Sequence, residues 1–375
     1  MSGSLRVAYD ARLSLGRYRG MGQFLRMLIA GHEREFLGFC AAGEQDSSLR
    51  LVASGHRFYP LWEQVSLPKL IDRERVDLFL APYNTAPLRL PAHVVLVLVV
   101  HDFIYFEPLP LSRSIYQNFG RLYRRAIVPR ALQRADVIVT VSHYTEEQMV
   151  RHWGVARQKI QVIPNSLEAQ WFTPTPMPRI AGGYIFMVSG EAPSKNLARA
   201  IAAYARYREL CGEPSLLLKI AGVKVQFHSG FRALAKRVGV ADYIEFLEYL
   251  PTDQMRHLYS NAALFVLPSL VEGFGIPVLE AMASGTPVVA SRSASLLEVG
   301  GAAARYFDPH SIEDIAKTMR DVLANPALLL EMSELGRHQV RGFHPDIVSE
   351  TVRRFWHSCL GRASESAIDS IPVVP

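Results

Sequence analysis

Cysteine is scarce in this chain of 375 residues. The three cysteines, Cys40, Cys211 and Cys359, lie far apart, form no Cys-x-x-Cys motif and leave an odd one over. Such spacing favours neither a disulfide framework nor a structural zinc site. It fits a protein of a reducing compartment such as the cytosol.

Long apolar runs are missing as well. The longest is residues 94–100, between His93 and His101, whereas a membrane-spanning helix needs about 20 apolar residues. We therefore expect residues 93–100 to form a buried strand rather than a membrane anchor. The first residues lack the basic and then apolar pattern of a secretory signal peptide, which predicts a cytoplasmic location.

Acidic side chains are absent from residues 113–134, which contain six arginines from Arg113 to Arg134. Residues 1–175 carry 21 Lys and Arg against 15 Asp and Glu, a net of +6, whereas residues 176–375 are balanced at 20 against 20. Because apolar and aromatic residues alternate with the arginines, the segment predicts either a solvated helix face beside a core stripe or a peripheral contact with an anionic membrane. Nucleic acid is a weaker interpretation, since no nucleic-acid-binding motif accompanies the charge.

Length and periodicity indicate two α/β domains. With 49% hydrophobic and 20% charged residues, the chain can build two cores of about 150 to 180 residues each. Short apolar strands alternate with helical segments, which is typical of βα units and parallel sheets. The expected strands are residues 5–10, 36–40, 57–60, 78–81, 93–100, 137–141, 185–188, 216–221, 243–246 and 263–267.

The stretch at residues 268–284 is the strongest candidate for a ligand site. It follows an apolar strand and contains Glu272 and Gly275 before a helix that we expect to begin at Pro277 and to carry Glu280 in its first turn. A Gly-rich loop and a helix start at the carboxyl end of a parallel strand can bind phosphates or hydroxyls. The alternative is an ordinary turn, in which Glu280 only complements the helix dipole.

The same stretch carries a resemblance to a known family. Residues 272–290 read Glu-Gly-Phe-Gly-Ile-Pro-Val-Leu-Glu-Ala-Met-Ala-Ser-Gly-Thr-Pro-Val-Val-Ala, which resembles the signature of the retaining glycosyltransferases of family 4. The resemblance continues at residues 220–222, 259–262, 295–301 and 306–309. A run of matches in one order is far more specific than a lone Gly-rich loop.

The resemblance implies the α/β GT-B fold, two Rossmann-like parallel-sheet domains facing a central cleft. Residues 1–170 would form an N-terminal, acceptor-side domain, and residues 184–345 a C-terminal domain that binds the nucleotide sugar. Residues 171–183, rich in proline and glycine, would link them. A helix at residues 346–360 would cross back to the N-terminal domain, and residues 361–375 would form a frayed tail.

In the C-terminal domain, the resemblance implies that Glu280 accepts hydrogen bonds from the ribose hydroxyls and that Glu272 engages the sugar hydroxyls. Lys195 would neutralise the diphosphate, the more so because small residues replace the family's glycine and arginines just before it. Asn196 is expected to cap the helix that follows. The remaining implied donor contacts in this domain are Leu250, Phe274, Gly275, Ile276 and Leu279.

In the N-terminal domain, a strand followed by a Gly-x-Gly loop makes Gly20 and Gly22 candidate neighbours of the diphosphate. His101 and Asp102 end the most apolar strand, where the resemblance places the donor sugar, so His101 is a candidate catalytic residue with Glu272 and Lys195. Ser142 is expected to cap a helix and to line the cleft.

Together these features predict a retaining transferase that moves a hexose from a nucleotide diphosphate sugar to a growing lipopolysaccharide or exopolysaccharide glycan, with an acceptor that is lipid-linked. Mannose from GDP-mannose is the expected donor, because Trp62-Glu-Gln and the following Leu67-Pro68 resemble surface-polysaccharide mannosyltransferases. No cofactor and no metal are expected, since the chain has no Asp-x-Asp pair. A sugar-nucleotide epimerase and a non-catalytic sugar-binding protein are the alternatives.

Overall fold

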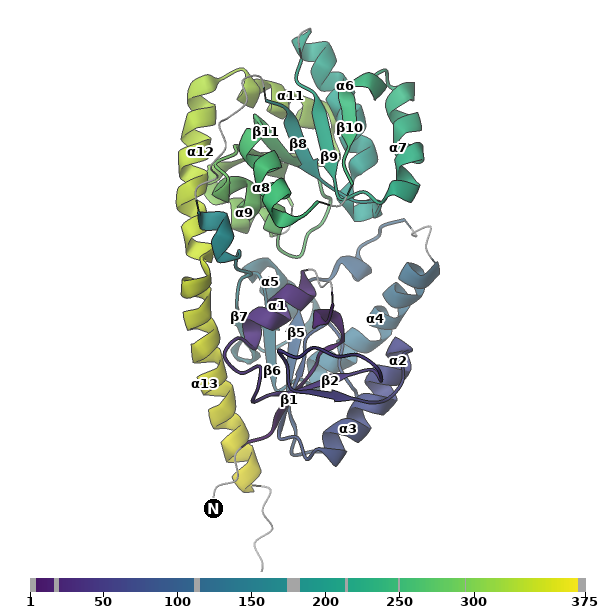
Figure 1. Ribbon diagram of the computed structural model, residues 1–375, viewed down its shortest axis with the longest axis vertical. Helices are drawn as coiled ribbons and strands as arrows, with labels where there is room; N and C mark the ends of the chain where they lie inside the picture. Colours follow the sequence, from purple (N-terminus) through teal and green to yellow (C-terminus); the bar gives the residue numbers. More distant parts are fainter. Residues whose placement is uncertain are drawn as a thin grey trace, which may run out of the picture. The chain divides into compact units, whose positions relative to one another are not determined.

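The computed structural model describes residues 5–16, 20–110, 115–173, 183–212, 215–248, 250–293 and 295–369 (Figure 1). The chain divides into two compact units, which are described separately. The first comprises Met1–Glu107, Ser114–Asn165 and Val348–Pro375. The second comprises Pro108–Arg113 and Ser166–Ile347. Most of the predicted linker, at residues 174–182, lies outside the described residues.

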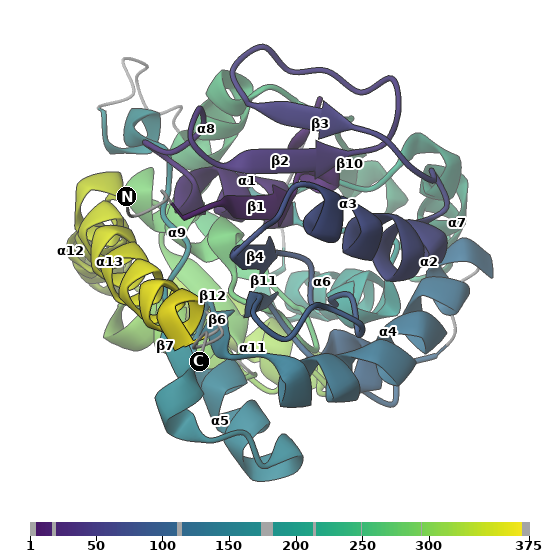
Figure 2. The same ribbon diagram turned by 90° about the horizontal axis from the view of Figure 1, so that it is seen from below.

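The first unit is built on a seven-stranded parallel sheet with the order β3-β2-β1-β4-β5-β6-β7. Its strands are β1 (Val7–Asp10), β2 (Leu37–Cys40), β3 (Leu51–Ala53), β4 (Leu78–Ala81), β5 (Val95–Val100), β6 (Val137–Thr140) and β7 (Ile160–Val162). Figure 2 shows β3, β2, β1 and β4 following one another across this sheet. All of its strand pairs are parallel and its central strands are buried, which confirms the predicted parallel sheet.

One strand prediction is wrong. Aromatic residues at 57–60 favour a strand by propensity, but Pro60 lies in the first turn of the short helix α2 (Tyr59–Leu61), where its fixed φ suits a helix. A π-helical turn at Trp62–Ser66 and helix α3 (Leu67–Arg73) continue from it. The edge strand is instead β3, which pairs with β2.

Helices cover both faces of the first sheet. They are α1 (Met21–Leu28), α3, α4 (Ile115–Arg134), α5 (His143–Trp153) and most of α13 (Pro345–Asp369). On one face Trp62, α3 and α4 pack into a buried core with strand residues such as Phe79. None of the described helices is both long and apolar enough to cross a membrane.

Helix α13 is tied into the first unit by Trp356. The indole Nε1 donates to the carbonyl oxygen of Leu28 at 2.6 Å. The indole ring packs edge-on against the Phe36 ring, with 4.8 Å between the ring centroids. From Val348 onward the helix belongs to this unit. It continues to Asp369 rather than ending at residue 360, so the part of the expected tail before residue 370 is helical.

The second unit contains a six-stranded parallel sheet with the order β10-β9-β8-β11-β12-β13. Its strands are β8 (Ile185–Val188), β9 (Leu218–Ala221), β10 (Ile244–Phe246), β11 (Leu264–Leu267), β12 (Val288–Ser291) and β13 (Ala304–Phe307). Its helices are α6 (Leu197–Cys211), α7 (Val225–Arg237), α8 (Thr252–Asn261), α9 (Ile276–Ala283), α10 (Leu296–Gly300), α11 (Ile312–Leu323) and α12 (Pro326–Val340). The four strands predicted here are confirmed.

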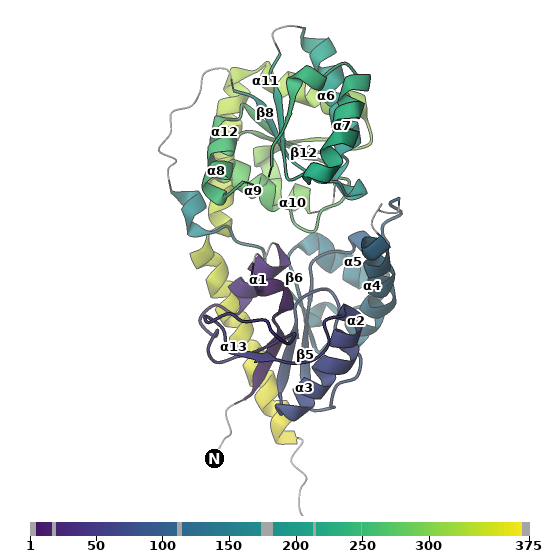
Figure 3. The same cartoon turned by 45° about the vertical axis from the view of Figure 1, so that its right-hand side comes forward.

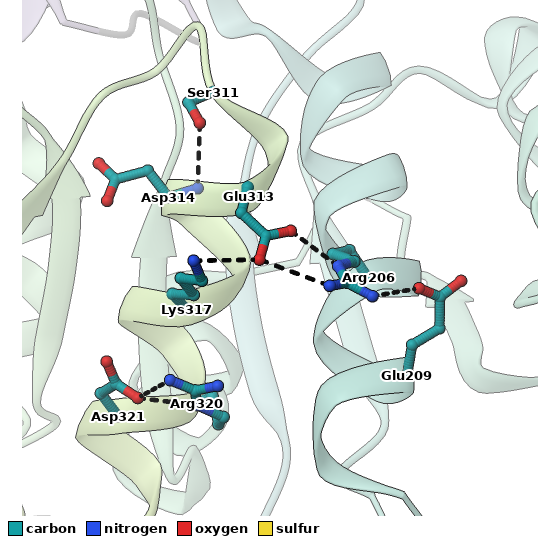
Figure 4. A network of polar contacts seen from close by, with 8 residues as sticks. All are labelled: Arg206, Glu209, Ser311, Glu313, Asp314, Lys317, Arg320 and Asp321. Atoms are coloured by element: carbon teal, nitrogen blue, oxygen red, sulfur yellow. Dashed lines mark hydrogen bonds and ion pairs between the residues drawn. The ribbon is translucent and has the colours of Figure 1, made fainter.

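Two of these helices, α6 and α11, lie side by side and share a network of charges (Figure 4). Arg206 of α6 lies 2.7 Å from Glu313 of α11 and 2.9 Å from Glu209 of its own helix. The Ser311 side chain caps α11 by accepting from the backbone N–H of Asp314. These contacts hold α6 in place, and α6 begins at Leu197, two residues after Lys195.

Each sheet has a switch point where the strand order reverses. In the first unit it lies between β1 and β4, and in the second between β8 and β11. Loops that leave neighbouring strands in opposite directions open a crevice there, and doubly wound sheets bind ligands at that place. The loops after β8 and β11, together with helix α9, carry eight of the fourteen candidate site residues named from the sequence.

Candidate functional site

The loop after β11 passes directly into α9. This helix begins at Ile276, with Pro277 in its first turn. Gly275 precedes it with φ 107°, and a Cβ atom at this position would lie 2.5 Å from Cδ2 of Leu296. Figure 3 shows α9 next to α10, the helix that carries Leu296. Glycine is therefore required here both by the left-handed backbone and by the close approach of α10.

Ser295 holds the same loop from the far side. Its Oγ lies 3.0 Å from the carbonyl oxygens of both Glu272 and Phe274. The Phe274 ring is buried and packs edge-on against Phe343. Leu279, one turn further into α9, is fully buried. The loop thus has a fixed shape before any ligand arrives.

Glu272 and Lys195 meet across the switch point. Lys195 Nζ lies 2.7 Å from Glu272 Oε1, and the Ser269 hydroxyl donates to the same oxygen at 2.6 Å. The Glu272 side chain is 11% exposed and that of Lys195 is 34% exposed. Two of the predicted catalytic residues are therefore ion-paired, and both can still be reached by a ligand.

The loop after β8 is fastened to the loop after β11 by Asn196. Its Nδ2 donates to the carbonyl oxygens of Pro268 at 2.9 Å and Pro309 at 2.8 Å. The prediction that Asn196 caps α6 through its side chain is wrong, because its Oδ1, the atom that would accept from the helix backbone, accepts from Nη1 of Arg199 instead. Its backbone has φ 56°, in the left-handed region that asparagine tolerates better than most residues.

Glu280 lies in the second turn of α9, so its prediction in the first turn is wrong. The helix begins one residue before Pro277, and no acidic residue lies in its first turn. The fully buried Tyr259 of α8 donates its hydroxyl to Glu280 Oε2 at 2.7 Å. Burial raises the pKa of the Glu280 carboxyl to about 7, against the lowering effect of this hydrogen bond. Near neutral pH the carboxyl therefore exists both with and without its proton.

His101 follows β5 in the first unit and is buried. Its backbone N–H donates to Asn84 Oδ1 at 2.6 Å, and its Nε2 lies 2.9 Å from the carbonyl oxygen of Pro82. Since a carbonyl only accepts, we assign the ring proton to Nε2, which leaves Nδ1 as an acceptor. Burial lowers the pKa of His101 to about 4. The ring is therefore neutral at physiological pH.

The remaining predicted residues of the first unit lie at starts of helices and loops. Asp102 Oδ1 accepts from the backbone N–H of Ile104 at 3.1 Å. Ser142 is fully buried and caps α5 by accepting from Thr145, as predicted. Gly20 precedes α1 with φ 31°, but Gly22 lies within the helix rather than in a loop. Residues 17–19 lie outside the described residues.

The structure brings Lys195, Asn196 and the residues of the β11 loop to one place in the second unit. Leu250 lies apart from them, half-buried in the loop between β10 and α8, and its neighbour Tyr249 lies outside the described residues. Sequence reasoning did not find the supporting roles of Ser269, Ser295 and Tyr259. Their partners are set by the packing of strands and helices, which local pattern does not report.

Two family models match the chain. The model described as "Glycosyl transferases group 1" covers residues 181–339, and the model described as "Glycosyltransferase Family 4" covers residues 26–171. Between them they match most of both units.

Curated relatives are similar over part of the chain. The MMP alpha-(1->4)-mannosyltransferase of Mycolicibacterium hassiacum is 26% identical over 65% of this chain and 60% of the relative. O-antigen chain mannosyltransferase B of Escherichia coli is 28% identical over 52% of this chain and 53% of the relative. O-antigen chain mannosyltransferase RfbU of Salmonella typhimurium is 27% identical over 67% of this chain and 65% of the relative. The chain thus spans 53% to 65% of the length of these three relatives.

Solved structures share the fold of this chain. Anabaena Alr3699/HepE in complex with UDP-glucose superposes with a TM-score of 0.74 at 16% identity, covering 94% of this chain and 100% of that one. WaaG, a glycosyltransferase involved in lipopolysaccharide biosynthesis, superposes with a TM-score of 0.71 at 17% identity, covering 92% and 99%. Identity this low reports on architecture alone.

Proposed function

This chain belongs to glycosyltransferase family 4 and has its GT-B fold, and we propose that it transfers a hexose from a nucleotide diphosphate sugar with retention of the anomeric configuration. The acceptor is a growing lipopolysaccharide or exopolysaccharide glycan. The observation that carries this proposal is the meeting of Lys195 and Glu272 at the β8–β11 switch point, at the start of the helix that holds Glu280.

The second unit binds the donor. Glu280 accepts hydrogen bonds from the ribose hydroxyls when it is ionised, and Tyr259 holds its carboxyl in position. Glu272 engages hydroxyls of the sugar, and the backbone N–H groups around Phe274 to Ile276 face the same space. The rigid loop supports this assignment, because a preformed site loses less entropy when it binds a ligand.

The leaving group is a nucleoside diphosphate, on which negative charge grows as the bond to the sugar breaks. Lys195 is the cation placed to stabilise that charge, together with helix N-termini and the N–H groups of the loops. A diphosphate competes with Glu272 for the Lys195 ammonium, and binding of the donor frees Glu272 for the sugar. We assign no protein nucleophile. The departing phosphate takes the proton of the acceptor hydroxyl on the same face of the sugar.

In this proposal the first unit contributes His101 and residues at the starts of helices and loops. His101 offers Nδ1 as a hydrogen-bond acceptor for a sugar hydroxyl, and its low pKa keeps it from competing as a cation. Asp102, Ser142, Gly20 and Gly22 are its companions in this proposal. Each of them lies at a helix or loop start in the first unit.

Mannose from GDP-mannose is the donor that we propose. The names of several curated relatives, which are mannosyltransferases of O-antigen chains, support the sugar. None of the relatives cited above is named an epimerase or a binding protein. We propose no cofactor and no metal, as the sequence led us to expect.

A lipid-linked acceptor and a peripheral contact with an anionic membrane at its cytoplasmic face complete the proposal. Helix α4 exposes Phe119 and Leu122 at 46% and 66%. Two of its arginines, Arg121 and Arg125, are already committed, because both donate to the carbonyl oxygen of Tyr105. The charge left for a membrane is therefore smaller than the six arginines suggest, and Arg113 lies outside the described residues.

A thermal-shift panel tests the donor proposal. The purified chain is heated with nucleotide sugars and nucleoside diphosphates of each base, with and without EDTA, and beside Glu280→Ala. A ligand at a hundredfold excess over its Kd adds about 2.7 kcal/mol of stability. We expect a shift with guanine nucleotides that EDTA leaves unchanged and that the variant loses. If no nucleotide shifts the wild type at millimolar concentration, the proposal fails.

A further inference from the structure

A second polar cluster lies in the first unit, at the β1–β4 switch point, and the proposed donor chemistry does not use it. Arg12 follows β1 almost directly. Its guanidinium carbon lies 5.2 Å from the centroid of the Tyr59 ring and 5.3 Å from that of Trp62. Both distances are within the range of cation–π contacts. The two rings thus form an aromatic platform beneath a cation.

Buried hydrogen bonds fix this platform. Trp62 is fully buried, and its Nε1 donates to Asp10 Oδ2 at 3.0 Å. The Tyr59 hydroxyl donates to Glu63 Oε1 at 2.8 Å, and the Tyr123 hydroxyl of α4 donates to Glu63 Oε2 at 2.5 Å. Glu63 is itself buried. Because these buried groups satisfy one another, the rings keep one orientation.

The cation on the platform is short of partners. Arg12 Nη2 donates to the carbonyl oxygen of Arg57 over a long 3.3 Å. Arg12 Nη1 is shielded from solvent and has no hydrogen-bond partner among the described residues. Burial raises the pKa of Asp10 to about 7, so the negative charge of that carboxyl is incomplete at neutral pH. An anion that pairs with the guanidinium would satisfy the unmet donor.

Arg12 as a whole is half-exposed although Nη1 itself is shielded, so an anion would approach the guanidinium from the exposed part of the side chain. The surface beside it is apolar. Figures 1 and 3 show α2 close to α4, and the Phe58 and Phe119 rings that bracket this junction lie 6.0 Å apart. We name the exposed side chains here the apolar patch; they are Phe58, Leu61, Phe119 and Leu122. Clustered exposed apolar side chains mark interaction sites.

We propose that Arg12 on its aromatic platform binds the phosphate of a lipid-linked glycan acceptor, and that the apolar patch receives the lipid chain. The proposal rests on the proposed transferase function and assigns its lipid-linked acceptor a binding site in the first unit. The juxtaposition of an unsatisfied guanidinium and an exposed apolar surface selects this ligand. A free phosphate would gain nothing from contact with the apolar patch, and a neutral lipid would not pair with the Arg12 guanidinium.

Binding of farnesyl phosphate to the full chain, below the micellar concentration, tests this site. We expect saturable binding to the wild type and a loss of about tenfold to a hundredfold for Arg12→Gln, the range that charge-assisted hydrogen bonds imply. Arg89→Gln, at an exposed arginine of the same unit, is the matched control and binds as the wild type does. The double variant Phe58→Ser and Leu122→Ser weakens binding of farnesyl phosphate without altering the response to inorganic phosphate.

Farnesol and inorganic phosphate test the lipid part and the phosphate part of the ligand separately. Farnesol, which lacks the phosphate, should bind the wild type more weakly than farnesyl phosphate and should not respond to Arg12→Gln. Inorganic phosphate should also bind more weakly than farnesyl phosphate. If inorganic phosphate binds as tightly as farnesyl phosphate, the lipid part of the proposal is wrong. Equal binding of farnesyl phosphate to wild type and Arg12→Gln overturns the whole of it.

The folding of the variants and the donor function are read separately. If Arg12→Gln unfolds, Arg12→Lys takes its place. Lysine keeps the charge but lacks the planar fork of the guanidinium. We therefore expect Arg12→Lys to bind farnesyl phosphate more weakly than the wild type and Arg89→Gln do, but still measurably. Wild-type affinity in Arg12→Lys would then overturn the proposal. A nucleotide thermal shift on the same samples reports the donor site of the second unit. If the wild type shows no shift, the transferase proposal is wrong. If the shift is intact but the Arg12 variants bind farnesyl phosphate as the wild type does, only the acceptor site is wrong.

Discussion

The ammonium group of Lys195 lies 2.7 Å from Oε1 of Glu272, although the two residues are 77 positions apart in the chain. Each comes from a loop at the carboxyl end of a neighbouring strand, β8 or β11. The pair joins the residue proposed for the diphosphate to the residue proposed for the sugar. Changes to one member are therefore expected to affect both parts of the donor.

Replacing Lys195 by glutamine should weaken binding of a nucleoside diphosphate by about tenfold to a hundredfold, because a charge-assisted hydrogen bond is lost. The matching nucleoside, which has no phosphate, should bind as before. Isothermal titration at low salt measures both affinities. Lys317→Gln on α11, whose side chain is 51% exposed, is the control. Equal loss for nucleoside and diphosphate would show that Lys195 does not act on the phosphates.

Nucleotide affinity should rise with pH through about 7 and level off near pH 8. Only the ionised carboxyl of Glu280 accepts from both ribose hydroxyls, and burial raises its pKa to about 7. The charged or titratable groups that act on it are Tyr259 and Glu168. Affinities measured from pH 5.5 to 8.5 should follow one titration, and Glu280→Gln should flatten the curve. A flat wild-type profile would contradict the role of this carboxyl.

Tyr259→Phe should move the midpoint of that pH profile upward. The Tyr259 hydroxyl donates to Glu280 at 2.7 Å and lowers its pKa, so its removal leaves the effect of burial unopposed. A purely structural role would weaken binding equally at every pH. Tyr184→Phe serves as the control, because its hydroxyl donates to the carbonyl oxygen of Leu258 instead.

Gly275→Ala should destabilise the second unit by about 1 to 3 kcal/mol, the cost of a strained backbone at an over-determined position. The new Cβ would lie 2.5 Å from Leu296 at φ 107°. Gly230→Ala is the matched control, since Gly230 lies in helix α7 with open space around it. That change should stabilise the helix by about 0.5 to 1 kcal/mol. Urea unfolding measures both.

The first unit should lose stability as pH falls from about 6.5 towards 4. His101 has a pKa of about 4 in the folded chain, so in this window the unfolded chain binds more protons and is favoured. His101→Gln should remove that part of the slope. Unfolding at pH 4.5 and 7 compares the two proteins. Parallel losses in both would mean that His101 is not the titrating group.

Local pattern predicted much of the fold. Strands such as β5 and β11 are continuous apolar runs, as expected for strands buried on both faces, and the αβ alternation between them predicted both parallel sheets. The helix start at residues 276–277 and the cap at Ser142 were also legible, because a helix end depends on residues within one turn of it. The edge strand β3 was not predicted, because it has only three residues and none of them is fully buried.

The chemistry of single side chains was decided by tertiary structure. Asparagine often caps helices, yet the side chain of Asn196 donates hydrogen bonds to the carbonyl oxygens of Pro268 and Pro309, far along the chain. Sequence reasoning offered Glu280 either as a ligand contact or as a carboxylate that complements the helix dipole, yet burial in the folded chain raises its pKa to about 7.

The sequence by itself determined the alternation of strands and helices, the family signature and the residue types available at each loop, because these depend on neighbours along the chain. Only the tertiary structure decided which of those residues meet. Lys195 reaches Glu272, and Arg12 lies on Tyr59 and Trp62, because the sheet order places their loops at a common edge. Periodicity in the sequence indicates which face of a strand or helix a residue occupies, but it does not indicate which distant residues pack against that face.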